Sequence, residues 1–234
     1  MKRLTRRQAL EALGSAGVAM VAACSSPPTT PSGTGTTSQG TTNSSACVIT
    51  PSETEGPYPD RTGMFSNPAF HRRDITEGKP GIPLAVTMTI VNARSSCGPV
   101  ANAVVEVWHC DVTGNYSEYG QGAGQTYLRG LQTTDANGAV TFNTIYPGWY
   151  AGRATHIHVE VFVNGANVKT TQIAFPESVS AAVYASGVYA SHGQNSTTNA
   201  RDNVFSDGVN DELATVSGTP ASGYTATLTI GISA

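Results

Sequence analysis

Six runs of the chain alternate apolar and polar residues and are rich in Val, Ile and Thr. They span residues 84–91, 103–110, 139–145, 156–164, 169–175 and 225–232. Clusters of Gly, Asn, Pro and Ser separate them, as is typical of strands joined by turns. A short helix is expected only at residues 178–185, after Pro176. The pattern predicts an all-β fold, an antiparallel β-sandwich with long loops and little helix, in which connections such as residues 186–211 lie over one end.

The run that begins at His156 has two chemically different faces. A period of two puts His156, His158, Glu160 and Phe162 on one face and Ile157, Val159, Val161 and Val163 on the other. The aliphatic face is expected to pack in the core. The two imidazoles then stand one pleat apart, a spacing at which both can bind one cation. The alternative is a pair of exposed or hydrogen-bonded histidines. The Pro-Gly turn, two tyrosines, tryptophan and arginine at residues 146–153 favour a site.

The chain begins with features of an export signal. Four basic residues (Lys2, Arg3, Arg6 and Arg7) precede an apolar run at residues 9–23, which is too short to span a membrane. Residues 5–10 resemble a twin-arginine signal, and residues 21–24 resemble a bacterial lipobox whose Cys24 becomes the lipidated N-terminus. We therefore expect a signal peptide at residues 1–23 and a flexible Ser/Thr/Gly-rich tether at 24–46. The product would be an exported periplasmic or cell-surface lipoprotein that meets the membrane only through Cys24.

Residues 47–234 have a suitable length for one domain with a sizeable core. Charged residues make up only 12% of the chain, and the net charge is −3. No basic patch accompanies the predicted strands, so the composition argues against a nucleic-acid partner. The sequence leaves the oligomeric state open.

An exported chain permits disulfides, and three cysteines remain if Cys24 carries lipid. Cys47 lies at the start of the predicted domain and Cys97 lies in a Ser-Ser-Cys-Gly-Pro turn, so both are expected at the surface. We expect these two to pair and to pin the start of the domain. Cys110 ends a predicted strand beside Trp108, and we expect it to be a free, buried thiol.

A second motif, at residues 105–117, makes a family resemblance specific. A strand ends in Trp-His and is followed by Asp, Gly and Tyr-Ser, and Pro-Gly-x-Tyr and Arg-x-x-His-x-His follow downstream at residues 147–158. This order resembles the intradiol catechol dioxygenases. Residues 54–58 (Thr-Glu-Gly-Pro-Tyr) resemble another segment of that family. The resemblance runs from about Cys47 to Phe175 and gives no alignment for the last sixty or so residues.

The resemblance implies that Tyr116, Tyr150, His156 and His158 hold a non-haem ferric ion. Fe(III) is a hard cation that favours anionic oxygen donors, and a phenol with a pKa of about 10 becomes a phenolate at neutral pH when a metal replaces its proton. Tyr146 competes for the role of Tyr150, but the order Pro-Gly-x-Tyr favours Tyr150. Only five residues separate Tyr150 from His156, a shorter connection than in the best-known family members.

By the same resemblance, Arg153 stabilises negative charge that develops on the catechol ring, and Gln172 lines the same pocket. The alternatives are a solvated loop charge for Arg153 and backbone pairing for Gln172. Tyr58 and Arg129 are further candidates for the pocket, or else packing or rim residues.

The implied reaction uses O2 to cleave a catechol between its two hydroxyl-bearing carbons, which yields a cis,cis-muconate-type diacid. Tyr150 would act as the base that completes substrate deprotonation. No organic cofactor is needed, and the preferred catechol stays open.

Two alternatives belong to other functional classes. In the first, His109 joins His156 and His158 in a three-histidine zinc or copper site. In the second, a non-catalytic surface sandwich binds aromatics or glycans through Trp108, Trp149 and its tyrosines.

Overall fold

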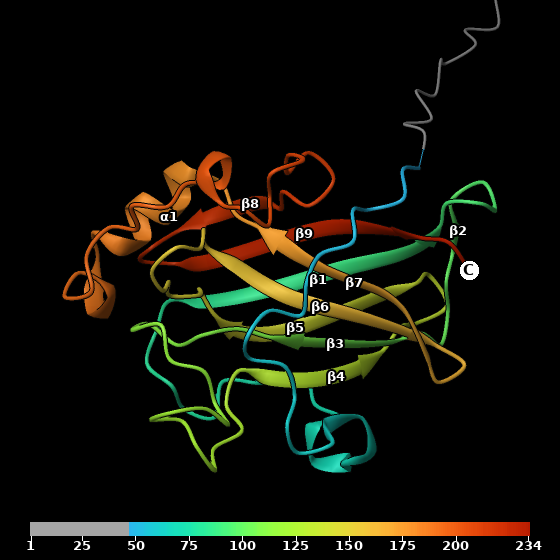
Figure 1. Cartoon of the computed structure of the whole chain (residues 1–234), viewed down its shortest axis with the longest axis horizontal. Helices are drawn as coiled ribbons and strands as arrows, with labels where there is room; N and C mark the ends of the chain where they lie inside the picture. The colour runs from blue at the N-terminus through green and yellow to red at the C-terminus, as the bar shows by residue number, and fades with distance from the viewer. Residues whose placement is uncertain (1–46) are drawn as a thin grey trace, which may run out of the picture. The chain divides into compact units, whose positions relative to one another are not determined.

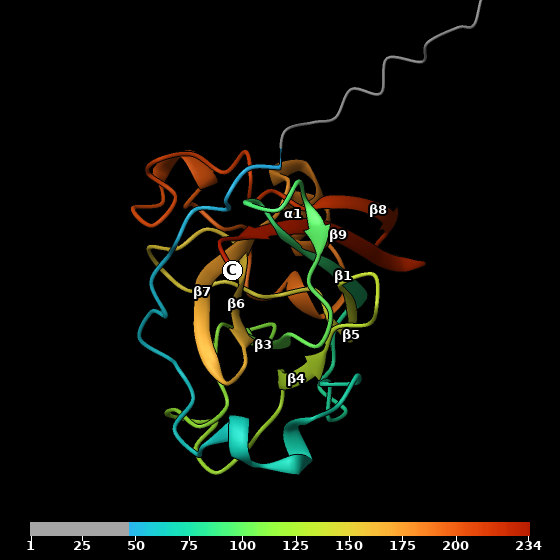
Figure 2. The same ribbon diagram turned by 90° about the vertical axis from the view of Figure 1, so that its right-hand side faces the viewer.

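The computed structural model of the chain describes residues 47–234. Two β-sheets pack face to face, and Figure 2 shows them as two layers. The first sheet has the order β4-β3-β6-β7. Its strands are β4 (Arg129–Thr133), β3 (Val104–Trp108), β6 (His156–Val163) and β7 (Ala166–Ala174). The expected signal peptide, the tether and Cys24 lie outside the described residues.

The second sheet has the order β2-β1-β9-β8, and β5 also pairs with β1. Its strands are β1 (Pro83–Asn92), β2 (Gly98–Pro99), β5 (Ala139–Ile145), β8 (Thr215–Thr219) and β9 (Gly223–Ile232). One α-helix, α1 (Glu177–Tyr184), follows β7 (Figure 1). Short 3-10 helices lie at Met64–Ser66, Pro68–Phe70, Gly187–Tyr189 and Asn199–Arg201. Within residues 47–234, no helix is both long and apolar enough to cross a membrane.

The predicted β-sandwich is confirmed, and all six predicted runs form strands. One pairing differs from the antiparallel expectation, because β9 runs parallel to β1 over nine residue pairs. The sequence pattern did not predict β2, β4 and β8. Strand β2 has only two residues, and the sequences of β4 (Arg-Gly-Leu-Gln-Thr) and β8 (Thr-Val-Ser-Gly-Thr) contain glycine and few apolar residues. Their pairing comes from neighbouring strands rather than from their own alternation.

Strand β6 is covered on both faces. Ile157, Val159 and Val161 pack in the core between the sheets, as predicted. The opposite face is also buried, since His156, His158 and Glu160 are each less than 10% exposed. The segment after Cys47 crosses this face (Figure 1), and Glu53 N donates a hydrogen bond to Thr170 O of β7. The histidine pair therefore lies inside the molecule.

Within residues 47–234, the structure holds no disulfide: Cys47, Cys97 and Cys110 are free thiols. Cys110 is buried as predicted. The predicted Cys47–Cys97 bridge is not formed, although both residues line one surface depression of about 340 Å³. Cys97 lies in a turn with φ 62°. Cys47 lies three residues before Thr50, whose backbone N donates a hydrogen bond to Gly231 O of β9. The two thiols therefore line the same depression without a bond between them.

The last strand is an integral part of the core, and this can be tested. Replacing Ile230 in β9 with Ala should lower the free energy of unfolding by roughly 2 to 5 kcal/mol, because this fully buried side chain would leave a cavity. Thr227→Ala, on the exposed face of the same strand, is the matched control and should change it by about 1 kcal/mol or less. Urea unfolding followed by circular dichroism measures both. Equal effects would contradict a central place for β9.

Candidate metal centre

Two imidazoles and two phenols converge at one end of the first sheet. His156 and His158 point from β6 toward one another, with their Nε2 atoms 3.1 Å apart. The hydroxyl of Tyr116, from the loop after β3, lies 3.4 Å from His156 Nε2. The ring of Tyr150 lies 5.7 Å from that of His156 and 5.8 Å from that of Tyr116. The structure thus brings together the four residues that the family resemblance implied.

The two imidazoles are neutral at physiological pH. Burial lowers the pKa of His156 to about 3, with the charge of Arg153 as the next cause. Burial, followed by the charge of His156, lowers the pKa of His158 well below its usual value. Neutral imidazoles are the form that binds metals. His156 Nδ1 donates a hydrogen bond to Ala154 O, so its Nε2 presents a lone pair toward His158.

Three polar groups surround this lone pair, which can accept only one strong hydrogen bond. Tyr116 Oη and Arg153 Nη1 each lie 3.4 Å from His156 Nε2, and His158 Nε2 is closer still. His158 Nδ1 is buried and has no partner among the described residues. If His158 carries its proton there, two lone pairs face each other across 3.1 Å. A cation that accepts both lone pairs removes this conflict, so the donor set fits a metal ion.

The phenols also favour a cation of a particular kind. Burial raises the pKa of Tyr116 well above 10 and raises that of Tyr150, despite the opposing charge of Arg153, so both phenols are protonated at neutral pH until a metal ion displaces the protons. Among residues 47–234, no group of three or more His, Cys, Asp or Glu is placed to hold a metal. A cation here would need the tyrosine oxygens, which suit a hard ion such as Fe(III).

The loop that carries Tyr116 is fixed by Asp111. Its Oδ1 accepts hydrogen bonds from Thr113 N and Asn115 N, both at 3.0 Å, and its Oδ2 pairs with Lys79 at 2.9 Å. Gly148 of the Pro-Gly turn packs directly on this loop, because a Cβ there would lie 2.1 Å from Asp111 O. The glycine therefore lets the two tyrosine-bearing segments approach each other.

The ring of His158 is held on its sides. Trp108 stacks on it with centroids 4.7 Å apart and an interplanar angle of 2°. Gly56 lies against its edge with φ +72°, and a Cβ there would be 3.0 Å from His158 Cε1. Tyr58, two residues on, stacks on Tyr116 at 4.4 Å. The Glu-Gly-Pro-Tyr segment thus covers the site, and Tyr58 belongs to it.

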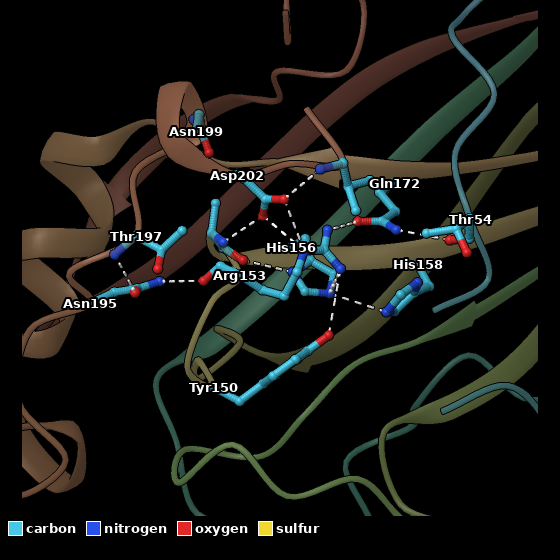
Figure 3. A network of polar contacts seen from close by, with 12 residues as sticks. Thr54, Tyr150, Arg153, His156, His158, Gln172, Asn195, Thr197, Asn199 and Asp202 are labelled. Atoms are coloured by element: carbon cyan, nitrogen blue, oxygen red, sulfur yellow. Dashed lines mark hydrogen bonds and ion pairs between the residues drawn. The ribbon is translucent and has the colours of Figure 1, made fainter. Parts of the chain in front are cut away.

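Arg153 faces Tyr150 and His156 rather than solvent. Its Nη1 points toward Tyr150 (Figure 3) and lies 3.5 Å from Tyr150 Oη. The Arg153 side chain is only 12% exposed. Its Nη2 donates to Gln172 Oε1, and Gln172 Nε2 donates to Thr54 O at 2.9 Å. Gln172 is fully buried and holds Arg153 from β7. Of the further candidates, Arg129 is also fully buried, but it donates to Tyr58 O at 2.9 Å and supports the covering segment.

Tyr146 does not reach the site. Its side chain is fully buried in the core between the sheets, and its hydroxyl bonds to Ser180 Oγ at 2.8 Å. The short connection before β6 still brings Tyr150 to the histidines, with Gly152 at φ +89° in the turn.

The three-histidine alternative is wrong for this structure. His109 Nδ1 donates to Cys110 O at 2.9 Å, and its Nε2 bonds to Thr144 Oγ1 at 2.7 Å, so both nitrogens are engaged away from β6. The surface-binding alternative also does not fit, because neither of its two tryptophans has an exposed side chain. Trp108 is 1% exposed beneath His158, and Trp149 packs against His192 with its Nε1 bonded to Gly193 O.

Comparisons with known proteins identify relatives of this chain. A family model described as Dioxygenase (Dioxygenase_C) matches residues 54–183, more than half of the chain. An intradiol ring-cleavage dioxygenase from Tetranychus urticae has a similar structure, with 29% sequence identity, a TM-score of 0.72, and coverage of 80% of this chain and 95% of that one. The chain belongs to the intradiol ring-cleavage dioxygenase family.

Two further dioxygenases are similar to this chain. The dioxygenase domain of a carbohydrate-binding fusion protein from Streptomyces sp. SirexAA-E is 29% identical, with a TM-score of 0.58 and coverage of 79% of this chain and 97% of that one. Catechol 1,2-dioxygenase 1 of Acinetobacter lwoffii is 29% identical over 53% of this chain and 45% of its own length. The aligned region thus spans less than half the length of this curated relative. Members of the family generally use non-haem Fe(III).

The buried His109 predicts a pH dependence of stability. Burial lowers its pKa to about 4, whereas the unfolded chain takes up this proton near pH 6.5. The stability from neutral His109 is therefore complete above pH 6.5, is lost as the pH falls toward 4, and amounts to roughly 3 kcal/mol. Urea midpoints should fall more steeply over this window in wild type than in His109→Gln. Parallel profiles would contradict a neutral, buried His109.

Proposed function

We propose that this protein is a non-haem Fe(III) dioxygenase that cleaves catechol-type rings with O2. Tyr116, Tyr150, His156 and His158 would be the four protein ligands of the iron. The observation that carries the proposal is the convergence of two buried imidazoles and two phenols beside the guanidinium of Arg153. A set of two nitrogens and two phenol oxygens, with no carboxylate, matches the preference of a ferric ion for phenolate donors.

The reaction adds both atoms of O2 to the substrate. The bond between the two hydroxyl-bearing carbons breaks, and each carbon becomes a carboxyl carbon, so catechol plus O2 gives cis,cis-muconic acid with all atoms conserved. A bound ferric ion would hold both catechol oxygens and make the ring electron-rich enough to react with O2 directly.

The two tyrosines have different roles in this proposal. Tyr150 is half-buried, whereas Tyr116 is 2% exposed and stacked beneath Tyr58. Tyr150 can therefore move when substrate enters, and its oxygen can accept a proton from a catechol hydroxyl. Tyr116 stays in place and sets the affinity of the site for its ion.

Arg153 supplies positive charge where the substrate becomes negative. Its Nη1 points toward the space between Tyr150 Oη and His156 Nε2 and can donate to an oxygen that gains charge during ring attack. Gln172 keeps that edge of the guanidinium in place by accepting from Nη2.

Three tyrosine variants test the assignment. Iron-loaded wild type should absorb visible light as a ferric phenolate, and Tyr116→Phe and Tyr150→Phe should both alter that spectrum. Tyr150→Phe should lower turnover by about 100-fold, because a base is lost, and still bind catechol. Tyr116→Phe should also weaken iron binding. Absorption spectra and oxygen uptake with catechol, protocatechuate, hydroxyquinol and caffeate measure these effects and identify the preferred substrate.

Tyr146→Phe is the control, since it removes a hydroxyl of the same kind from the core. It should leave the spectrum and the activity unchanged. A spectrum altered by Tyr146→Phe and untouched by Tyr150→Phe would overturn the ligand assignment.

We also propose that the protein is exported and anchored by a lipid on Cys24. The twin-arginine and lipobox resemblances at residues 5–24 support this. The full chain should partition with membranes, and Cys24→Ser should move it to the soluble fraction after cell lysis. Cys110→Ser, which changes a buried thiol, is the control and should stay with membranes. A Cys24→Ser protein that remains membrane-bound would refute the lipid anchor.

A further inference from the structure

We infer that Asp202 is a positioning residue that holds Arg153 in its working orientation, a role that rests on the proposed function of Arg153. Asp202 lies in the C-terminal region, far along the chain from every residue of the site that the sequence pattern indicates. Both of its carboxylate oxygens accept from Arg153 Nε, at 2.9 and 3.0 Å. Its side chain is completely buried, so water does not compete for this ion pair.

The guanidinium is fixed through two of its nitrogens. Asp202 holds Nε, and Gln172 holds Nη2, as Figure 3 shows. Two anchors define the plane of the group and leave Nη1 as the edge that faces Tyr150 and His156. With Gln172 alone, the guanidinium could rotate about a single contact, and a buried Nε–H would lose its partner.

Asp202 also balances charge at the centre. Arg153 Nη1 lies 3.4 Å from His156 Nε2, the nitrogen proposed to face the iron. The guanidinium would therefore lie near a bound cation and repel it. A buried carboxylate on the far side of the guanidinium offsets this repulsion. Arg153 can then stand beside the cation without weakening its binding.

Asp202 is itself held on both sides. Its Oδ2 accepts from Ala154 N at 2.6 Å, in the connection that leads into β6, and its Oδ1 accepts from Val204 N at 2.8 Å. We call residues 192–202 the C-terminal clamp. Other bonds join this clamp to the same turn: His192 Nε2 donates to Trp149 O at 2.9 Å, and Asn195 Nδ2 donates to Arg153 O at 2.9 Å. The carboxylate is therefore placed by the fold.

The test compares Asp202→Asn with Asp207→Asn. The first keeps the shape and an oxygen acceptor for Ala154 N but removes the charge. The second makes the same change at an exposed residue of the same loop. In metal-free protein, the Arg153 Nε–H resonance should be protected from solvent exchange in wild type and in Asp207→Asn, and this protection should be lost in Asp202→Asn. Retained protection in Asp202→Asn would overturn the inference.

In iron-loaded enzyme, Asp202→Asn should lower kcat by about 10- to 100-fold with a much smaller change in KM, because it acts through a group used in the reaction. Asp207→Asn should keep wild-type activity. Placed on Arg153→Gln, Asp202→Asn should cause no further loss, since its partner is already absent. Losses that multiply in the double variant would show a general structural role and refute positioning through Arg153.

Asp202→Glu is a second variant that tests the same contact. If Asp202→Asn does not fold, Asp202→Glu keeps the charge and shifts it by one methylene, and the same loss of Nε–H protection and of kcat is expected, to a smaller degree. Protection and kcat equal to wild type in Asp202→Glu would count against the inference. If wild type cleaves no catechol, the proposed function fails, while the exchange measurement still tests the Asp202 contact.

Discussion

The burial of four metal-type donors around one point is the constraint on which the rest of the structure depends. A buried polar atom without a partner costs about 1 to 3 kcal/mol. Here a single lone pair, on His156 Nε2, faces Tyr116, Arg153 and His158. Such a cluster is stable when a cation takes the lone pairs and the surrounding chain keeps water out. Both faces of β6 are covered, one by the core and the other by the segment after Cys47.

The two sheets carry different kinds of side chain on their outer faces. The sheet β4-β3-β6-β7 carries polar residues on its outer face, and these are buried with the site. Burial, followed by the charge of Glu160 across the strands, raises the pKa of Glu106 to about 8. The fully buried Arg129 is close enough to offset part of this effect. The other sheet supplies core residues from β1, β5 and β9 and presents threonines such as Thr225 and Thr227 to solvent. The polar site therefore lies on one sheet, whereas both sheets contribute to the core.

The short connection between Tyr150 and His156 is held in place by residues from the C-terminal clamp. It contains Gly152 at φ +89°, and two of its residues are exposed. The C-terminal clamp bonds to its backbone at Arg153 O and Ala154 N and to its side chain at Arg153. Residues far apart in the chain thus fix a turn that carries both a proposed ligand and the guanidinium.

Much of the site was readable from the sequence, because local order specifies it. A period of two places His156 and His158 on one face of a strand. The long apolar strands were readable for the same reason. The family resemblance, through its Pro-Gly-x-Tyr order, favoured Tyr150 over Tyr146. Tertiary structure alone decided the rest. Strand β4 and the parallel pairing of β9 with β1 depend on neighbours distant in sequence. Asp202 carries no local pattern, since an ion pair across 49 residues depends on where the fold brings the two chain segments together. Alternation and turn chemistry act over a few residues, whereas burial and charge pairing act through space.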